Sequence, residues 1–73
     1  MEELDARGLR CPLPVLKARK RLKSLDEGAQ LRVLADDPAS VIDVPHFCTE
    51  QGHVLESQVQ EDEALVFVIR KGG

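Results

Sequence analysis

The sequence predicts an α+β fold, a two-layer sandwich in which two helices pack on one face of a mixed four-stranded sheet. Strand and helix patterns alternate in the order β-α-β-α-β-β along the 73 residues. Such an order implies a mixed sheet, and both helices most simply cover the same face of it. Hydrophobic residues make up 42% and charged residues 32% of the chain, which is typical of a globular protein. We therefore expect a single domain spanning residues 1–73.

The first third of the chain predicts a short strand and a basic helix. Residues 2–6 form an extended segment that ends at Gly8. From Pro14 to Leu25, apolar residues recur at helical spacing and basic residues occupy the other face. The apolar positions are Val15, Leu16, Ala18, Leu22 and Leu25. Gly28 then serves as a stop or turn.

The middle of the chain predicts a second strand and a second helix. Residues 30–35 alternate between the two faces of a strand. Asp36-Asp37-Pro38 is a helix-start signal, with a capping aspartate and a proline at the first helical position. Helical spacing continues over residues 39–51, but Pro45 interrupts it. We expect one short turn and then a new helix start capped by Asp43.

Two strands complete the chain. Residues 54–60 form one, a turn at residues 61–63 follows, and residues 64–70 form the other. The last strand is almost entirely apolar, as expected for a central strand. The chain has no tryptophan or tyrosine and only two phenylalanines, so the core is expected to be aliphatic.

Composition excludes several classes of protein. No apolar run approaches a membrane span, and the N-terminus is acidic where a signal peptide would be basic. We therefore expect a cytoplasmic protein without a membrane contact. The two cysteines are not expected to form a disulfide in a reducing compartment. A module that binds RNA is disfavoured by the net charge of −3, by the shortage of stacking aromatics and by the lack of a glycine-rich loop.

The charge is unevenly distributed along the chain. Residues 7–23 contain seven basic residues and no acidic one, whereas residues 24–73 contain ten acidic residues and three basic ones. The basic residues of the first segment are Arg7, Arg10, Lys17, Arg19, Lys20, Arg21 and Lys23. This pattern predicts a positive surface near Cys11, although a basic helix face can also be merely solvated.

The stretch G-L-R-C-P-L-P-V-L at residues 8–16 carries the candidate chemistry. Pro12 and Pro14 are expected to hold Cys11 outside the following helix but at its N-terminal end. The helix dipole and the neighbouring Arg10 would then both favour the thiolate, which is the reactive form. A buried cysteine with a purely structural role is the alternative.

The sequence around Cys11 narrows the choice of thiol chemistry. A Cys-x-x-Cys redox pair is absent, because the other cysteine is Cys48. A cysteine hydrolase needs a deep, well-formed site that a chain of this length hardly supplies. A lone activated thiol on a small domain fits the transfer of a group between proteins.

Four motifs in order resemble the TusA (SirA-like) sulfur-carrier family and its Cys-Pro-x-Pro signature. They are L-D-A-R-G-L-R-C-P-L-P at 4–14, A-D-D-P-A at 35–39, D-V-P-H-F-C at 43–48 and I-R-K-G-G at 69–73. The resemblance implies a βαβαββ sandwich and a sulfurtransferase that acts as a stoichiometric persulfide carrier. It implies neither a cofactor nor a metal.

The resemblance also implies roles and partners. A cysteine desulfurase would pass sulfur to Cys11, and a relay protein would accept it, ultimately for 2-thiouridine at the tRNA wobble position. Related members supply molybdenum-cofactor assembly or sulfur oxidation instead. The dipole and Arg10 would steady the bound persulfide, while Pro12 and Pro14 present the cysteine. The basic residues of the helix, among them Lys17, Lys20 and Arg21, could meet acidic partner surfaces. We expect a monomer that does not itself bind nucleic acid.

The remaining reactive residues have simpler interpretations. Cys48 is expected to be a buried structural thiol. His46 and His53 do not complete a usual zinc spacing with the cysteines. Asp36 and Asp37 are expected to cap a helix.

A rival function rests on the terminal Gly72-Gly73. Ubiquitin-like sulfur carriers end in the same pair and carry sulfur as a thiocarboxylate. Those proteins open with a β-hairpin, however, and this sequence predicts one strand leading directly into a helix.

Overall fold

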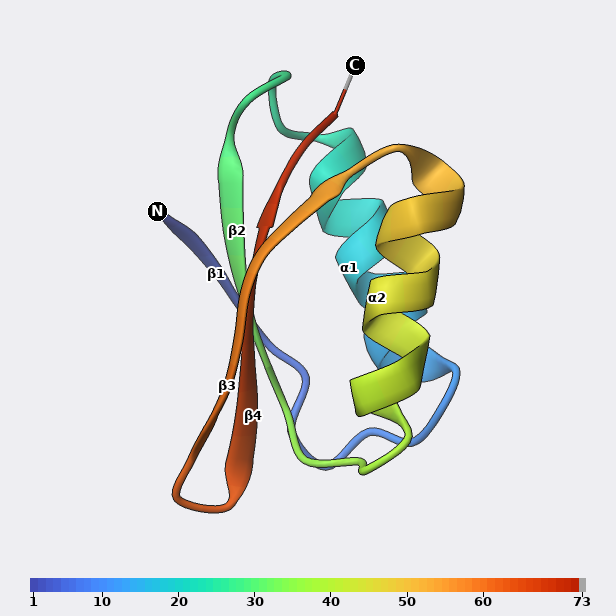
Figure 1. The fold of residues 1–73 in the computed structure, drawn as a ribbon, viewed down its shortest axis with the longest axis vertical. Helices are drawn as coiled ribbons and strands as arrows, with labels where there is room; N and C mark the ends of the chain where they lie inside the picture. The colour runs from blue at the N-terminus through green and yellow to red at the C-terminus, as the bar shows by residue number, and fades with distance from the viewer. Residues whose placement is uncertain (73) are drawn as a thin grey trace.

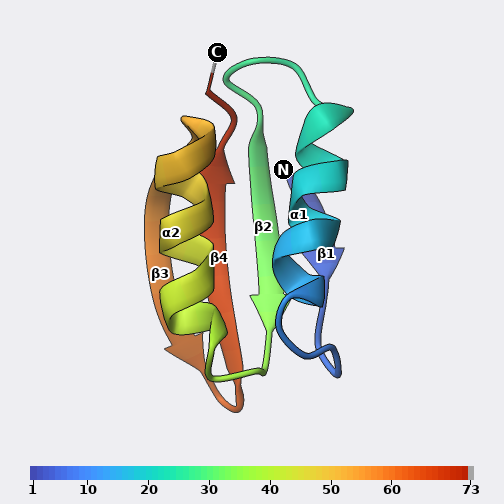
Figure 2. The same cartoon turned by 90° about the vertical axis from the view of Figure 1, so that its right-hand side faces the viewer.

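The computed structural model describes residues 1–72 and contains six elements in the predicted order. The strands are β1 (Glu2–Asp5), β2 (Gln30–Ala35), β3 (Val54–Glu61) and β4 (Ala64–Arg70). The helices are α1 (Leu13–Lys23) and α2 (Ser40–Gln51). Both helices lie side by side on one face of the sheet (Figures 1 and 2), so the predicted two-layer fold is confirmed. Among residues 1–72, no helix has the length and apolar character needed to cross a membrane.

The four strands form one mixed sheet in the order β1-β2-β4-β3. β1 and β2 are parallel, because the crossover through α1 returns the chain in the same direction. β4 is antiparallel to both β2 and β3. The almost entirely apolar β4 therefore occupies a central position, as its sequence predicts.

The core lies between the sheet and the helices. Alternate residues of the two central strands point towards the helices, and Leu31, Val33, Phe67 and Ile69 are each 0% exposed. Leu22 of α1 and other helical side chains pack against this layer. Apart from its phenylalanines and Cys48, the core is aliphatic, as predicted.

The face that α1 buries differs from the prediction. The buried residues are Pro14, Ala18 and Leu22, which follow one another at intervals of four. Leu16, which was expected in the core, is 48% exposed. The stripe that faces the sheet is narrower than the apolar pattern suggests, so Leu16 lies on the surface near the start of the helix.

The predicted break in the second helix is wrong. α2 is continuous from Ser40 to Gln51 with Pro45 inside it, and no new start occurs at Asp43. A proline in a helix interior costs about 3 kcal/mol. Val44, Phe47 and Cys48 are nonetheless buried against the sheet, and burial of side chains as large as Val or Phe contributes about 1.5–3 kcal/mol each. Packing therefore outweighs the local defect.

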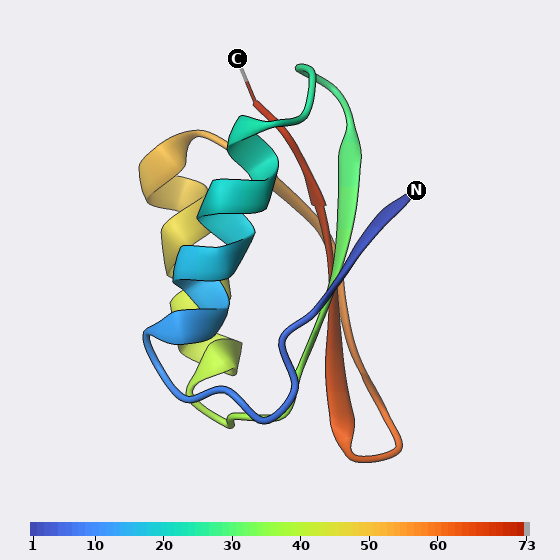
Figure 3. The same cartoon turned by 180° about the vertical axis from the view of Figure 1, so that it is seen from behind.

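Two loops meet at one end of the sheet and build the candidate site. β1 and β2 are parallel, so the loops after them, residues 6–12 and 36–39, leave the sheet at the same edge. Figure 3 shows the two loops running next to each other below the helices. Cys11 lies in the first loop, and the Asp-Asp-Pro sequence forms the second.

Candidate functional site

Cys11 is an exposed thiol at the point where the first loop enters α1. Pro12 is the N-cap residue and Leu13 begins the helix, so Cys11 lies outside the helix as predicted. The Leu13 N–H donates to the Arg10 carbonyl oxygen at 2.8 Å, which closes a turn around the cysteine. Pro14 lies in the first helical turn and is buried, so it also fixes the start of α1 to the core. The peptide bond between Cys11 and Pro12 is cis.

Two neighbouring carboxylates hold the backbone of the cysteine loop. The Gly8 N–H donates to both oxygens of Asp36, at 2.9 and 3.1 Å. The Cys11 N–H donates to Oδ2 of Asp37 at 2.6 Å. Oδ1 of Asp37 accepts the Ala39 N–H at 3.1 Å, so this carboxylate joins the cysteine loop to the turn that precedes α2. These bonds fix the position of Cys11 from a segment more than twenty residues away in the sequence.

The expected helix caps are therefore only partly correct. The N-cap of α2 is Ala39, and no side chain caps this helix. Asp37 supports the turn before the helix, whereas Asp36 binds the other loop. The hydrogen bonds from Cys11 and Ala39 hold the pKa of Asp37 below its usual value, and the charge of Arg10 contributes to the same effect.

The electrostatic environment of Cys11 contradicts the predicted activation. A hydrogen bond to the Asp43 side chain raises the pKa of the Cys11 thiol, with further contributions from desolvation and from the charges of Asp43 and Asp37. The positive charge of Arg10 acts instead on Asp37. The sequence prediction fails because these carboxylates lie distant in sequence but reach the cysteine through the second loop and α2. These effects favour the protonated thiol of Cys11 over the thiolate.

Cys11 opens onto a hollow of about 280 Å³ between the two helices, which we call the Cys11 hollow. Its lining comes from α1 with its N-cap and from α2, and it combines apolar and charged side chains. The lining residues are Cys11, Pro12, Val15, Leu16, Arg19, Asp43, His46, Phe47, Glu50 and Gln51. The exposed side chain of Leu16 thus belongs to this surface and not to the core. A partner segment seated in the hollow would contact Cys11.

The predicted basic contact residues lie together elsewhere on α1. Lys17, Lys20 and Arg21 line a separate hollow of about 330 Å³, together with Leu4 of β1 and Ser24. Arg21 is already paired with Glu2 at 2.8 Å. The structure thus brings these basic residues together, but along the β1 side of the helix and away from the Cys11 hollow.

Cys48 is buried, as predicted. Cys48 is 2% exposed, and burial raises the pKa of its thiol to about 11. His46 pairs with Glu50 at 3.1 Å on the exposed side of α2. Within residues 1–72, no group of three or more His, Cys, Asp or Glu side chains is arranged to hold a metal ion.

The C-terminal segment is attached to the turn between α2 and β3. The Gly72 N–H donates to Nδ1 of His53 at 3.0 Å. A Cβ atom at position 72 would lie 1.7 Å from the Gly52 carbonyl oxygen, so only glycine fits there. Burial and the charge of Lys71 lower the pKa of His53, which favours the neutral acceptor. Gly73, the second residue of the pair in the thiocarboxylate rival, lies outside the described residues.

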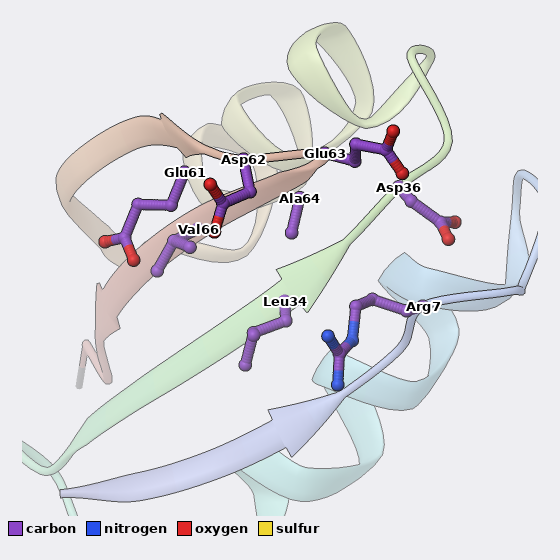
Figure 4. A pocket seen from close by; sticks show the side chains of 8 residues that line it. All are labelled: Arg7, Leu34, Asp36, Glu61, Asp62, Glu63, Ala64 and Val66. Atoms are coloured by element: carbon purple, nitrogen blue, oxygen red, sulfur yellow. The ribbon is translucent and has the colours of Figure 1, made fainter.

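A larger hollow of about 740 Å³ lies on the sheet face opposite the helices. Figure 4 shows Leu34 and Val66 at its base and acidic residues along its rim. Arg7 also lines this hollow, but its guanidinium is paired with Asp5 at 2.9 Å. No thiol lines this hollow, and Cys11 is the exposed cysteine among the described residues.

Comparison with known proteins shows the family of the chain. The sulfurtransferase TusA family profile matches residues 2–71. The chain belongs to the TusA family. A SirA-like protein from Desulfitobacterium hafniense has a similar crystal structure, with a TM-score of 0.87, 28% sequence identity and complete coverage of both chains. Membership of the TusA family gives the chain a role in sulfur transfer and places its fold with the SirA-like proteins.

Sequence reasoning missed the roles of three aspartates in this TusA-family site. The sequence predicts Asp36 and Asp37 as caps and Asp43 as a helix start, yet Asp36 binds the cysteine loop and Asp37 binds the Cys11 backbone. Asp43 lines the same hollow as Cys11 and raises the pKa of its thiol. One signal was available. Parallel strands place the loops after them at the same edge of a sheet, so polar residues after 30–35 were candidates to meet Cys11.

Proposed function

We propose that Cys11 carries sulfur as a persulfide between proteins. The observation that supports this most directly is the exposed thiol of Cys11 in a chain of the sulfurtransferase TusA family. Asp37 accepts the Cys11 N–H and so fixes the position of this cysteine. Cys48 is unsuited to the task because its side chain is buried. The donor in this proposal is a cysteine desulfurase in the cytoplasm, and a relay protein is the acceptor.

The transfer is a sulfur–sulfur exchange. The Cys11 thiol first loses its proton, and the thiolate attacks the outer sulfur of the donor cysteine persulfide. The donor S–S bond breaks, and its electron pair leaves on the donor sulfur, which is then protonated. The products are the Cys11 persulfide and the donor thiol. No external oxidant or reductant is consumed, because one S–S bond replaces another.

The acceptor pathway in this proposal is 2-thiouridine formation at the tRNA wobble position. Molybdenum-cofactor assembly and sulfur oxidation would use the same Cys11 persulfide. Deletion of the gene distinguishes the three, because only the first pathway predicts loss of 2-thiouridine from hydrolysed tRNA. Normal 2-thiouridine in the deletion strain would exclude it.

Two other functions have less support. Both phenylalanines are buried, at 6% and 0% exposure, so neither offers a stacking surface to RNA. The thiocarboxylate rival needs an accessible C-terminus, whereas Gly72 is bonded to His53. Replacement of Cys11 with serine, compared with deletion of Gly72-Gly73, separates a persulfide carrier from a thiocarboxylate carrier. The persulfide proposal predicts that only the serine variant loses sulfur loading.

A further inference from the structure

The thiol of Cys11 lies beside two carboxylates with different roles. Asp37 uses its oxygens to accept the backbone N–H groups of Cys11 and Ala39. Asp43 lies on the first turn of α2, lines the Cys11 hollow together with the cysteine and is the main cause of the raised pKa of its thiol. Asp37 therefore positions the cysteine through its backbone. The charges of both carboxylates act on the thiol, and Asp43 has the larger effect.

The charge of Asp43 has no basic partner among residues 1–72. None of the ion pairs in this part of the chain includes it. Arg19 lines the same hollow but forms no ion pair there, and His46 is paired with Glu50. Arg10 acts on Asp37. The described protein thus leaves the half-buried carboxylate of Asp43 in the Cys11 hollow without an ion-pair partner.

The basic cluster of α1 does not fill this role. Lys17, Lys20 and Arg21 line the hollow on the β1 side of the helix. The Cys11 hollow instead carries two acidic residues of α2, Asp43 and Glu50, and one arginine, Arg19 of α1. Opposite charges across an interface favour encounter and exclude wrong partners. The chemistry of this hollow therefore fits a positively charged group.

We propose that Asp43 is a specificity-determining residue, and that the Cys11 hollow accepts a sulfur donor that presents a cationic side chain beside the sulfur. Asp43 disfavours the thiolate while no donor is bound, which protects Cys11 from unwanted reactions. When the donor cation pairs with Asp43, the thiolate is no longer disfavoured and attacks the donor persulfide. This inference rests on the proposed sulfur-carrier function and adds a charge requirement to it.

The test uses small thiol reagents in place of the donor. Three alkyl methanethiosulfonates that differ only in charge, cationic, neutral and anionic, are reacted with the full chain at neutral pH and low salt. The wild-type protein is expected to react faster with the cationic reagent than with the anionic one. Asp43→Asn should reduce this ratio roughly tenfold. A nearby charge changes the free energy of another charged group by about the equivalent of one pKa unit, which corresponds to a tenfold change in rate. The same variant should react faster than wild type with the neutral reagent.

The matched control is Glu27→Gln, which removes an exposed carboxylate that does not line the Cys11 hollow. It should leave the neutral reagent rate unchanged and the charge ratio close to wild type. A second measurement needs no variant. At high salt the wild-type protein should lose its preference for the cationic reagent over the anionic one, because salt screens the charge. An unchanged ratio in Asp43→Asn, or an equal change in Glu27→Gln, would overturn the inference.

Sulfur loading separates this inference from the proposed function. If wild-type Cys11 takes up sulfur from a cysteine desulfurase but Asp43→Asn keeps the wild-type charge ratio, only the inference fails. If wild-type Cys11 takes up no sulfur, the proposed function fails, and with it the role of Asp43 towards a sulfur donor.

Discussion

Cys48 and Cys11 lie in opposite environments, and this contrast yields a quantitative prediction. Cys48 is 2% exposed with a pKa of about 11, whereas Cys11 is on the surface. At pH 7.5, a thiol with a pKa of about 11 is about 0.03% ionised, against about 10% for an ordinary cysteine with a pKa of about 8.5. Ionisation alone should therefore slow alkylation of Cys48 about 300-fold relative to an ordinary thiol, and burial slows it further.

The assay is a time course of iodoacetamide labelling followed by intact mass and peptide mapping. The native protein is expected to gain one label at Cys11 long before the second, and both sites should react quickly in guanidinium chloride. Cys48→Ala should keep the fast label and lose the slow one. This variant removes one buried sulfur atom, so its free energy of unfolding should fall by about 1 kcal/mol in a urea titration. Cys11→Ser is the control that keeps only the slow thiol.

One result would refute this reasoning. If Cys48 of the native protein reacts within a few-fold of Cys11, burial does not protect it. The assignment of a single reactive thiol would then be wrong.

Three further predictions concern the residues around this thiol. Asp37→Asn weakens the bond to the Cys11 N–H and should slow sulfur loading by about tenfold to a hundredfold. The same variant should lose less stability than wild type as pH falls below about 4. The wild-type Asp37 contribution is present above its unfolded pKa of about 3.9 and is lost as pH falls through its lowered folded pKa. Reversal of charge at Lys17 and Lys20 should slow sulfur loading by about tenfold at low salt and little at high salt. Equal loading rates in the wild-type protein and the variant would exclude a partner contact at these lysines. The lowered pKa of His53 means that its contribution to stability is full above about pH 6.5 and is lost as pH falls through the folded pKa, so His53→Gln should flatten that part of a pH–stability curve.

The fold could be predicted from the sequence because its signals are local. Strand alternation, helical spacing and glycine turns are readable in short windows, and they gave all six elements in order. The error at Pro45 came from a local rule that packing overrode. Val44 and Phe47 on either side of the proline are buried at 1% and 6% exposure, so the helix continues across it.

The candidate site could be predicted only in part. The exposure of Cys11 and its place before α1 follow from the two prolines beside it. The state of its thiol does not, because Asp37 and Asp43 come from the second loop and from α2. A sequence window around Cys11 contains Arg10 and predicts a lowered pKa, whereas the folded chain brings carboxylates to the sulfur and raises it.

The most direct test of the persulfide proposal is intact-mass analysis after incubation with a cysteine desulfurase and L-cysteine. The wild-type protein is expected to gain the mass of one sulfur atom, to carry it on the peptide that contains Cys11, and to lose it on treatment with a reductant. Cys11→Ser should remain unloaded while Cys48→Ala loads normally. The proposal would be contradicted if wild-type protein gained no sulfur, or if the added sulfur mapped to Cys48 or to the C-terminus.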